Sequence, residues 1–238
     1  PRWNGMMMWR GTTLARPFLD GRTMVQAGHR RAKFVVYPIE PVRPDGLQRI
    51  NWICDRRLRE DGFGGGLTAP SREDWSKPGS LDDLLPTFGS WRFAWLDVPG
   101  LIRAAEQILE WPMVDRDPLP RWRHGHTTLL GDAAHPMYPI GSNGATQAIL
   151  DAAALADALD GHASITAALN AYEAARLPMT RDIVAMNRRE GLDAILDMVE
   201  EAAPEGFARI EDVTDPTVLA EWVQAYKKTA GHQVDRPQ

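Results

Sequence analysis

The chain has 238 residues, 44% of them hydrophobic and 25% charged, which is enough apolar sequence for one large domain or two modest ones. Its 27 basic and 32 acidic residues give a net charge of −5, so it lacks the basic surface that nucleic acid or an anionic membrane attracts. The single cysteine, Cys54, excludes an internal disulfide framework and a CxxC metal site. No apolar run is long enough to cross a bilayer, and we expect a cytoplasmic protein without nucleic-acid or membrane partners.

The first part of the chain predicts an antiparallel sheet. Short runs of β-branched and aromatic residues alternate with Gly, Pro and Asp at the spacing of hairpins. About four strands of ordinary length are expected, at Met6–Arg10, Arg22–Gln26, Phe34–Ile39 and Arg49–Cys54. A loop rich in Gly, Pro, Ser and charged residues follows, from Asp61 to Gly79.

Two short helices and two strands are expected next. Ser80 is a suitable N-cap for a helix over Ser80–Phe88, and a proline in the first turn suits a second helix over Pro99–Leu109. Glu110–Val114 and Thr127–Leu130 are predicted strands.

Everything after Gly141 predicts helices. Two apolar stripes at helical spacing indicate buried faces, comprising Ile149, Ala152, Ala153, Ala156 and Leu159 in the first helix, and Ile165, Ala168, Leu169 and Tyr172 in the second, which Ser164 caps. Pro178 is expected to separate the second helix from a further helical stretch that reaches about Glu201. Thr214-Asp215-Pro216 opens a last helix.

One segment, Leu129 to Ala145, has a pattern that points to chemistry. A predicted strand ends at Asp132, a loop with Pro and Gly follows, and a helix begins after Gly141. Ligands of open α/β sheets bind beyond the carboxyl ends of strands, where a carboxylate can accept hydrogen bonds from a ribose hydroxyl. Gly141 and Gly144 allow the backbone to approach a planar ring, and the unpaired N–H groups of a helix N-terminus favour an anion.

Simpler interpretations of the same residues exist. In the first, Asp132 merely caps the end of a strand. In the second, Asp132 and His135 bind a metal ion, but the third ligand that a metal site needs is missing, so no metal is predicted. His135 is expected to be a structural, backbone-anchored histidine. The basic cluster of Arg121, Arg123, His124 and His126 is expected to be a solvated loop, with contact to a nicotinamide phosphate as the alternative.

The segment resembles the GD motif of the FAD-dependent aromatic hydroxylases, which have the para-hydroxybenzoate hydroxylase fold. The resemblance rests on Gly131-Asp132-Ala133-Ala134-His135-Pro136, on Met137 to Ala145, and on Asp151 and Leu155. It is greatest for the phenazine-carboxylate and salicylate hydroxylase branch. Weaker matches occur in the right order at Trp9-Arg10-Gly11, Gly21 to Met24, Tyr37-Pro38-Ile39, Asn51-Trp52, and Tyr172-Glu173 with Arg176 and Pro178.

The resemblance implies roles for the matched positions. Asp132 would bind ribitol or ribose hydroxyls of FAD, with Gly131 allowing close approach, and Pro139 would lie beside the reacting flavin carbon as the catalytic-site residue. The backbone of Gly141, Ser142, Asn143, Gly144 and Ala145 would face the N1–C2=O edge of the flavin. Trp9, Tyr37 and Tyr138 would line the substrate pocket.

The resemblance also implies a fold and a reaction. The fold class is α+β or α/β: a substrate domain over 1–115, the C-terminal strand-and-helices part of an FAD-binding domain over 116–203, and a helical tail over 204–238. The enzyme would hydroxylate a small aromatic substrate with dioxygen through a flavin C4a-hydroperoxide, with NAD(P)H as reductant.

The chain lacks the GxGxxG segment of such enzymes, because its only Gly-rich run, Gly62 to Gly66, follows no predicted strand. We therefore expect a fragment of a larger protein, which would pair with a second copy or with the absent N-terminal portion. Three alternatives stay open: a non-catalytic remnant or interaction module of the same fold that binds no FAD, a halogenase, or an epoxidase. The last two lack visible signature residues.

Overall fold

The computed structural model describes residues 1–59, 74–189 and 193–229. The Gly-rich run Gly62 to Gly66 lies outside the described residues. The chain divides into two compact units. The sheet unit contains the described residues among 5–62 and 69–113, and the helical unit contains residues 1–4 together with those described after residue 113. Each unit is described by itself.

The sheet unit is built on an antiparallel sheet of five strands. Their order across the sheet is β2 (Val25–His29), β3 (Ala32–Pro38), β4 (Gln48–Arg57), β1 (Arg2–Ala15) and β7 (Gln107–Asp115). The four predicted strands are confirmed, and Glu110–Val114 is also a strand. Strand β2 begins later than predicted because Asp20 accepts hydrogen bonds from the backbone N–H groups of Arg22 and Thr23, which form a turn there.

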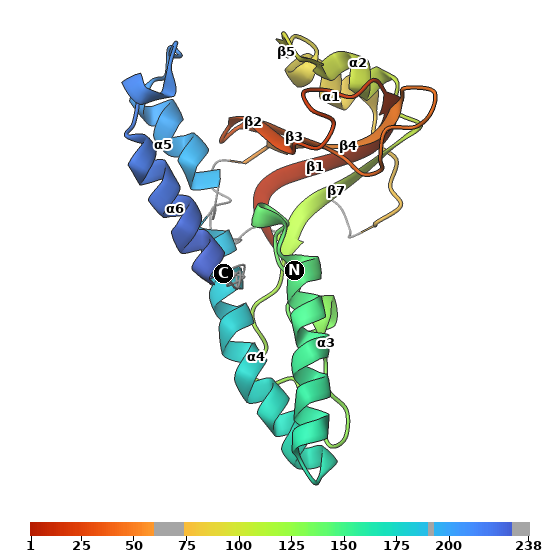
Figure 1. The fold of residues 1–238 in the computed structure, drawn as a ribbon, viewed down its shortest axis with the longest axis vertical. Coiled ribbons are helices and arrows are strands. Elements are labelled where there is room, and N and C mark those ends of the chain that lie inside the picture. The colour runs from red at the N-terminus through yellow and green to blue at the C-terminus, as the bar shows by residue number, and fades with distance from the viewer. Residues whose placement is uncertain (60–73, 190–192, 230–238) are drawn as a thin grey trace. The chain divides into compact units, whose positions relative to one another are not determined.

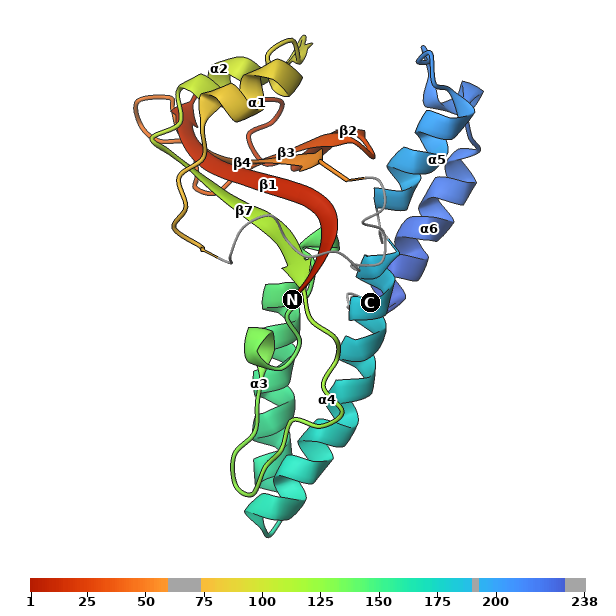
Figure 2. The same ribbon diagram turned by 180° about the vertical axis from the view of Figure 1, so that it is seen from behind.

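Two helices pack on one face of this sheet. Helix α1 (Leu81–Phe88) is capped as predicted by Ser80, whose hydroxyl accepts from the Asp82 N–H, and Phe88 packs on Phe34 of β3. Helix α2 (Val98–Arg103) follows the short strands β5 (Arg92–Phe93) and β6 (Leu96–Asp97). It ends before the predicted Leu109, since residues from Gln107 onward pair as β7. Figure 2 shows α1 and α2 on the same side of β1, β3 and β4.

The register places Trp9 on the helix-packed face. Trp9 is paired with Cys54, which is paired with Phe34, and side chains of paired residues point to the same side of a sheet. Trp9 is 2% exposed, and its indole N–H donates to the buried Glu110 carboxylate at 3.0 Å. Trp9 is therefore a core residue of this face with a satisfied polar group, and its burial does not favour the predicted substrate-lining role.

The opposite face, which we call the open face, carries polar as well as apolar side chains. From β1, β3 and β4 it presents Met8, Arg10, Thr12, Lys33, Val35, Tyr37, Asn51, Ile53 and Asp55. Lys33 and Asp55 form a buried ion pair with 3.1 Å between Nζ and Oδ2. The period of two along each strand fixes which residues share this face.

The helical unit is dominated by two long antiparallel helices, α3 (Gly144–Gly161) and α4 (Ile165–Arg188), which lie side by side (Figure 1). Ser164 caps α4 as predicted, through a hydrogen bond from the Ala167 N–H to its hydroxyl. Pro178 does not separate two helices, because α4 continues through it. Pro178 and Ala174 are both exposed, so water can replace the hydrogen bond that proline cannot donate.

The predicted strand Thr127–Leu130 is not formed. The backbone at Leu130 is extended, with φ −148° and ψ 161°, yet among the described residues this segment has only an isolated bridge from Thr127 to His124. An apolar run favours an extended backbone, but a strand also needs a neighbour that completes its ladder of hydrogen bonds.

Only one of the two predicted apolar stripes is buried. On α4, Ala168, Leu169 and Tyr172 are at most 5% exposed, whereas Ile165, the first residue of that stripe, is 51% exposed. On α3 the stripe is exposed, with Ile149 at 70% and Leu159 at 44%, and Ala152, Ala153 and Ala156 are exposed as well. Helix α3 instead packs on α4 through a second apolar face that includes Leu155 and Ala158. An alanine-rich helix is apolar on several sides, so its sequence did not indicate which side α4 covers.

The last part of the chain forms α5 (Ala194–Ala202), a 3₁₀ turn over Ile210–Asp212, and α6 (Pro216–Thr229). Asp215 starts α6 as predicted, accepting a hydrogen bond from the Thr217 N–H at 2.8 Å. Among the described helices, none has the length and apolar character needed to cross a membrane.

The buried pair on the open face gives a stability prediction. Asp55→Ala removes the carboxylate that pairs with the buried Lys33 ammonium, and we expect a loss of about 3–5 kcal/mol in the free energy of unfolding. The double variant Lys33→Met with Asp55→Leu removes both charges and should recover most of this loss. Urea unfolding followed by circular dichroism measures both changes.

The matched control is Glu106→Ala, which removes an exposed partner of Arg49 and should cost no more than about 1 kcal/mol. If Asp55→Ala is as mild as this control, the pair does not contribute as the structure indicates.

Candidate functional site

The segment singled out in the sequence begins with a tight turn at Gly131. Residues Gly131–Ala133 form a 3₁₀ turn in which the Gly131 carbonyl accepts from the Ala134 and His135 N–H groups, at 2.9 and 3.0 Å. Gly131 has φ +59°, and a Cβ there would lie 3.3 Å from the Ala148 Cβ of α3. Both the left-handed backbone and the close approach to α3 therefore require glycine.

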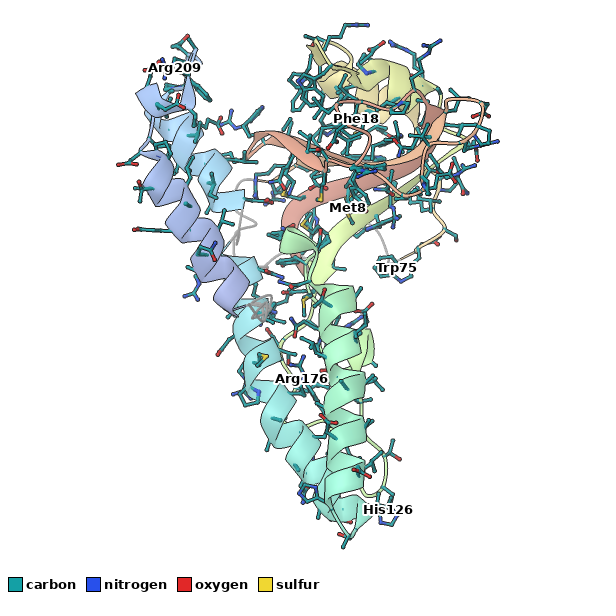
Figure 3. The ribbon with its side chains drawn as sticks, in the orientation of Figure 1. Met8, Phe18, Trp75, His126, Arg176 and Arg209 are labelled. Atoms are coloured by element: carbon teal, nitrogen blue, oxygen red, sulfur yellow. The ribbon has the colours of Figure 1, made fainter. Side chains whose placement is uncertain are left out.

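A buried carboxylate on α3 holds this turn in place. Asp151 is fully buried, and its two oxygens accept from three donors: the Gly131 N–H at 2.9 Å, Nε2 of His135 at 2.6 Å and Nε of Arg176 at 2.7 Å. Arg176 reaches from α4 toward α3, where Nη2 also donates to the Gln147 side chain at 2.7 Å (Figure 3). Asp151 thus joins the turn, α3 and α4.

The electrostatics of this cluster favour the charged carboxylate. Burial by itself raises the pKa of Asp151, but the hydrogen bonds from His135, the Gly131 amide and Arg176 together outweigh burial and hold the pKa below its ordinary value. Since the carboxylate only accepts, His135 donates from Nε2. His135 is thus anchored by a side-chain carboxylate and not by the backbone as predicted.

Aromatic side chains pack around the cluster. The ring of Trp122 lies 5.6 Å from that of His135 and 5.7 Å from that of Tyr172. The Tyr172 hydroxyl donates to the Leu129 carbonyl at 3.1 Å, which fixes the chain just before the turn. The Glu173 carboxylate accepts from the backbone N–H groups of Trp122 and Arg123. Helix α4 therefore positions the whole approach to Gly131.

After the turn, the chain makes a second bend and starts α3. Gly141 and Ser142 both have left-handed backbones, with φ of 73° and 55°. The N–H groups of the first turn of a helix have no partner within the helix. In α3 the side chain of the N-cap residue Asn143 does not accept a hydrogen bond from them. A Cβ placed on Gly144 would meet a single atom within 4 Å, Oδ1 of Asp132, at 3.8 Å. The space over the start of α3 is open and is bordered by a carboxylate.

The structure thus brings Asp132 beside the helix N-terminus, as the sequence pattern suggested. Of the predicted cofactor-binding residues, Asp132, Pro139, Ser142 and Ala145 are exposed, Gly141 and Gly144 are partly exposed, and Gly131 and Asn143 are buried. The carboxylate of Asp132 borders this open space and is exposed, so a ligand can reach it.

The predicted substrate-lining residues are distributed over both units. Tyr138, in the helical unit, is 1% exposed, and its hydroxyl donates to the Arg2 carbonyl at 3.1 Å. Asn187 donates to the Tyr138 carbonyl, so both the backbone and the side chain of this buried tyrosine are held by hydrogen bonds. Trp9 is buried in the sheet unit. Tyr37, half-buried on the open face, is the one of the three that still suits the predicted role.

Sequence reasoning missed the part that Asp151, Gln147 and Arg176 play. Asp151 and Arg176 were noticed as matched positions, but no role was assigned to them. The available signal was a carboxylate in an alanine-rich helix, since a charge in such a setting needs a partner if it is buried. Among the described residues, no group of three His, Cys, Asp or Glu side chains lies together as a metal site would require.

Comparisons with known proteins agree with this geometry. The family described as "FAD binding domain" matches residues 99–187, which include the turn, α3 and most of α4. A phenazine 1,6-dicarboxylic acid hydroxylase of Lysobacter antibioticus is 49% identical over 185 residues, 77% of this chain and 44% of that protein. A 3-amino-4-hydroxybenzoate 2-monooxygenase of Streptomyces platensis is 42% identical over 133 residues, 54% of this chain and 33% of that protein. This chain therefore spans less than half the length of these relatives.

Solved structures show the same fold. A salicylate hydroxylase in a substrate complex matches with a TM-score of 0.65 at 21% identity, over 99% of this chain and 59% of that one. Klebsiella pneumoniae HpxO complexed with FAD and uric acid matches with a TM-score of 0.58 at 21% identity, over 97% of this chain and 50% of that one.

Residues 99–187 match the family described as "FAD binding domain", and the fold is that of the solved salicylate hydroxylase. More narrowly, the chain is a homologue of part of the FAD-dependent aromatic hydroxylases, as the motif at Gly131-Asp132 indicated.

The Asp151 cluster predicts a specific pH dependence. A carboxylate whose pKa is lowered by folding stabilises the protein above the unfolded pKa of about 3.9, and this contribution is lost as the pH falls through the lower folded pKa. Asp151→Asn lacks this titration. The difference in free energy of unfolding between wild type and variant should be largest near neutral pH and shrink from about pH 5 to pH 3. Urea unfolding at a series of pH values measures it.

Asp157→Asn provides the control, because Asp157 is exposed on the same helix. Its effect should stay within about 0.5 kcal/mol. An Asp151→Asn deficit that is the same at every pH would contradict the assignment of a titrating, hydrogen-bonded carboxylate.

Proposed function

We propose that the open space over the start of α3 binds the flavin portion of FAD, and that the protein of which this chain is part hydroxylates an aromatic substrate. The observation that carries the proposal is the space over Gly144 at the start of α3, which Asp132 borders and where the first turn of the helix has no side-chain cap. It is held in place by the buried hydrogen bonds of Asp151.

The residues present fit this cofactor. Asp132 is exposed at the rim, where its carboxylate can accept hydrogen bonds from ribityl or ribose hydroxyls. The N–H groups of Gly144 and Ala145, at the start of α3, would face the electron-rich N1–C2=O edge of the ring, because a helix N-terminus favours negative charge. The Ser142 N–H instead donates to the Pro139 carbonyl at 3.0 Å. Gly144 carries no side chain into that space. Pro139 is exposed beside the bend and would pack against the ring.

The chemistry would come from the cofactor and the specificity from the protein. When bound and reduced by NAD(P)H, a flavin activates dioxygen for transfer to an electron-rich ring. The chain's own residues would orient the flavin, stabilise its negative charge and keep water out. The relatives named above act on phenazine 1,6-dicarboxylic acid and 3-amino-4-hydroxybenzoate, which supports a ring substrate here. A cytoplasmic location, where NAD(P)H is available, is part of this proposal.

We also propose that the exposed apolar stripe of α3 is an interface. In the described part of the helical unit, Ile149 and Leu159 are exposed and the segment at Leu130 is extended without a neighbouring strand. A sheet packed here would cover the two apolar side chains and would pair with that segment. Since the relatives are more than twice as long as the part matched, their unmatched portion is the proposed source of such a sheet. A second copy of this chain is the alternative that the experiment below distinguishes.

The first prediction concerns the cofactor. Titration of the purified chain with FAD, followed by flavin fluorescence and absorbance, should show binding that Asp132→Ala weakens at least tenfold. That factor corresponds to about 1.4 kcal/mol, within the range for hydrogen bonds to a charged group. Gly144→Val should weaken binding similarly by filling the space over the helix N-terminus.

Asp157→Asn serves again as the matched carboxylate control and should bind FAD as the wild type does. Equal affinity for FAD in Asp132→Ala and wild type would show that Asp132 is misplaced. A chain that binds no flavin at all would favour the non-catalytic interaction module.

The second prediction concerns the α3 stripe. Ile149→Glu should reduce the fluorescence of a bound apolar dye about twofold or more by breaking the apolar patch, without loss of helix content. Ile165→Glu, at an isolated exposed isoleucine on α4, should change dye binding little. Light scattering of the chain alone, and mixed with the unmatched portion of the Lysobacter relative, identifies the partner. A monomer in both samples, with no dye bound, would contradict an interface here.

A further inference from the structure

The guanidinium of Arg176 has an acceptor outside the buried cluster around Asp151. Its Nε donates to Asp151 and its Nη2 to the Gln147 side chain, each at 2.7 Å, while its Nη1 donates to the sulfur of Met179 at 3.1 Å. Arg176 is 5% exposed, but Met179, three residues further along α4, is 40% exposed. The arginine therefore connects a fully buried carboxylate with a thioether that solvent can reach.

Exposure of this kind makes the sulfur a chemical target. A thioether is a nucleophile that two-electron oxidants convert to a sulfoxide, and an exposed methionine is oxidised before a buried one. The structure describes all nine methionines of the chain, and only Met24, at 50%, and Met179 are exposed. Four methionines of the sheet unit are at most 6% exposed: Met6, Met7, Met8 and Met113.

The oxidation of Met179 needs only hydrogen peroxide as a co-reactant. The sulfur lone pair attacks one oxygen of the peroxide, an S–O bond forms, and the O–O bond breaks. The proton on the transferred oxygen moves to the departing hydroxide, so the products are methionine sulfoxide and water. Sulfur loses two electrons and the peroxide gains them. Sulfoxide reductases reverse the change.

A sulfoxide at Met179 would disturb the arginine that contacts it. The 3.1 Å between Nη1 and the sulfur leaves no room for an oxygen between them. A thioether is a weak acceptor and a sulfoxide is polar, so the new oxygen lies toward water and draws the guanidinium outward. Because the guanidinium is a rigid plane, moving Nη1 also moves Nε away from Asp151. The buried carboxylate then loses part of its hydrogen bonding, which destabilises the fold.

We propose that Met179 is an oxidation site, where hydrogen peroxide forms a sulfoxide that weakens the hydrogen bonds of the Asp151 cluster. The effect extends to the turn at Gly131, because Asp151 also accepts from the Gly131 N–H and from His135. The inference rests on the contacts of Arg176 and not on the binding of flavin, so it and the proposed function can fail separately.

The test compares the two exposed methionines. The purified chain, Met24→Leu and Met179→Leu are treated with hydrogen peroxide, and peptide mass spectrometry identifies a dose that oxidises exposed methionines and leaves buried ones unchanged. Urea unfolding gives the midpoint before and after treatment. We expect a fall of about 0.5 M or more in wild type and in Met24→Leu, the order expected for one lost hydrogen bond to a charged group. The midpoint of Met179→Leu should not change on treatment.

Two further measurements separate this effect from general oxidative damage. The NMR signal of the Arg176 Nε–H should shift when Met179 is oxidised, because its acceptor changes, and it should not shift in treated Met179→Leu. Incubation with the two methionine sulfoxide reductases, one for each epimer, should restore both the midpoint and the signal. Leucine is close to methionine in volume, and circular dichroism checks that each variant is folded.

The outcomes are decisive in both directions. Oxidation of Met179 without a fall in the midpoint overturns the proposal, and so does an equal fall in Met179→Leu. A Met179 that stays reduced while Met24 is oxidised overturns it as well, because the site then does not react. A reversible fall confined to proteins that carry Met179, together with the shifted Arg176 signal, establishes it. The FAD titration of the untreated chain judges the flavin site independently.

Discussion

The arrangement of the helical unit depends on one buried carboxylate. Asp151 is removed from water on α3, and it stays charged because a backbone amide, a histidine and an arginine donate to it from three different segments. Burying a carboxylate costs free energy unless hydrogen bonds satisfy its oxygens. The three segments that carry the donors must therefore stay close to Asp151 and to one another. The turn at Gly131 therefore has its position because of Asp151, although Asp151 itself does not reach the surface.

The local chemistry of this protein could largely be predicted from its sequence. Ser80, Ser164 and Asp215 were recognised as helix starts, because a short polar side chain before an apolar run satisfies the free N–H groups of a first turn. Glycine followed by aspartate is common, and the motif at Gly131-Asp132 is recognisable because the longer segment up to Ala145 resembles the GD motif of a known family. The four predicted strands were found from their composition, although the bounds of β2 shifted where Asp20 formed a turn.

Properties that depend on neighbouring elements of the chain could not be predicted from the sequence in the same way. Thr127–Leu130 has the composition of a strand but lacks a ladder among the described residues, and the apolar stripe of α3 is exposed while another face of the same helix is covered. Composition reports what a segment could bury, and only the neighbouring element decides what it does bury. For Trp9 the face of the sheet could not be predicted: whether its side chain shares a face with Tyr37 depends on the pairing register, which a single sequence does not specify.

Ser142 shows what such a constrained bend implies for recognition. A residue other than glycine rarely adopts φ near 55°, and the conformation is kept here because the chain is fixed on both sides, by the start of α3 and by the packed Tyr138. The conformational entropy of the bend is therefore lost on folding, and little more of it is lost when a ligand binds. In the proposed flavin site, a rigid bend of this kind would select molecules that already match its outline and would adapt poorly to those that do not.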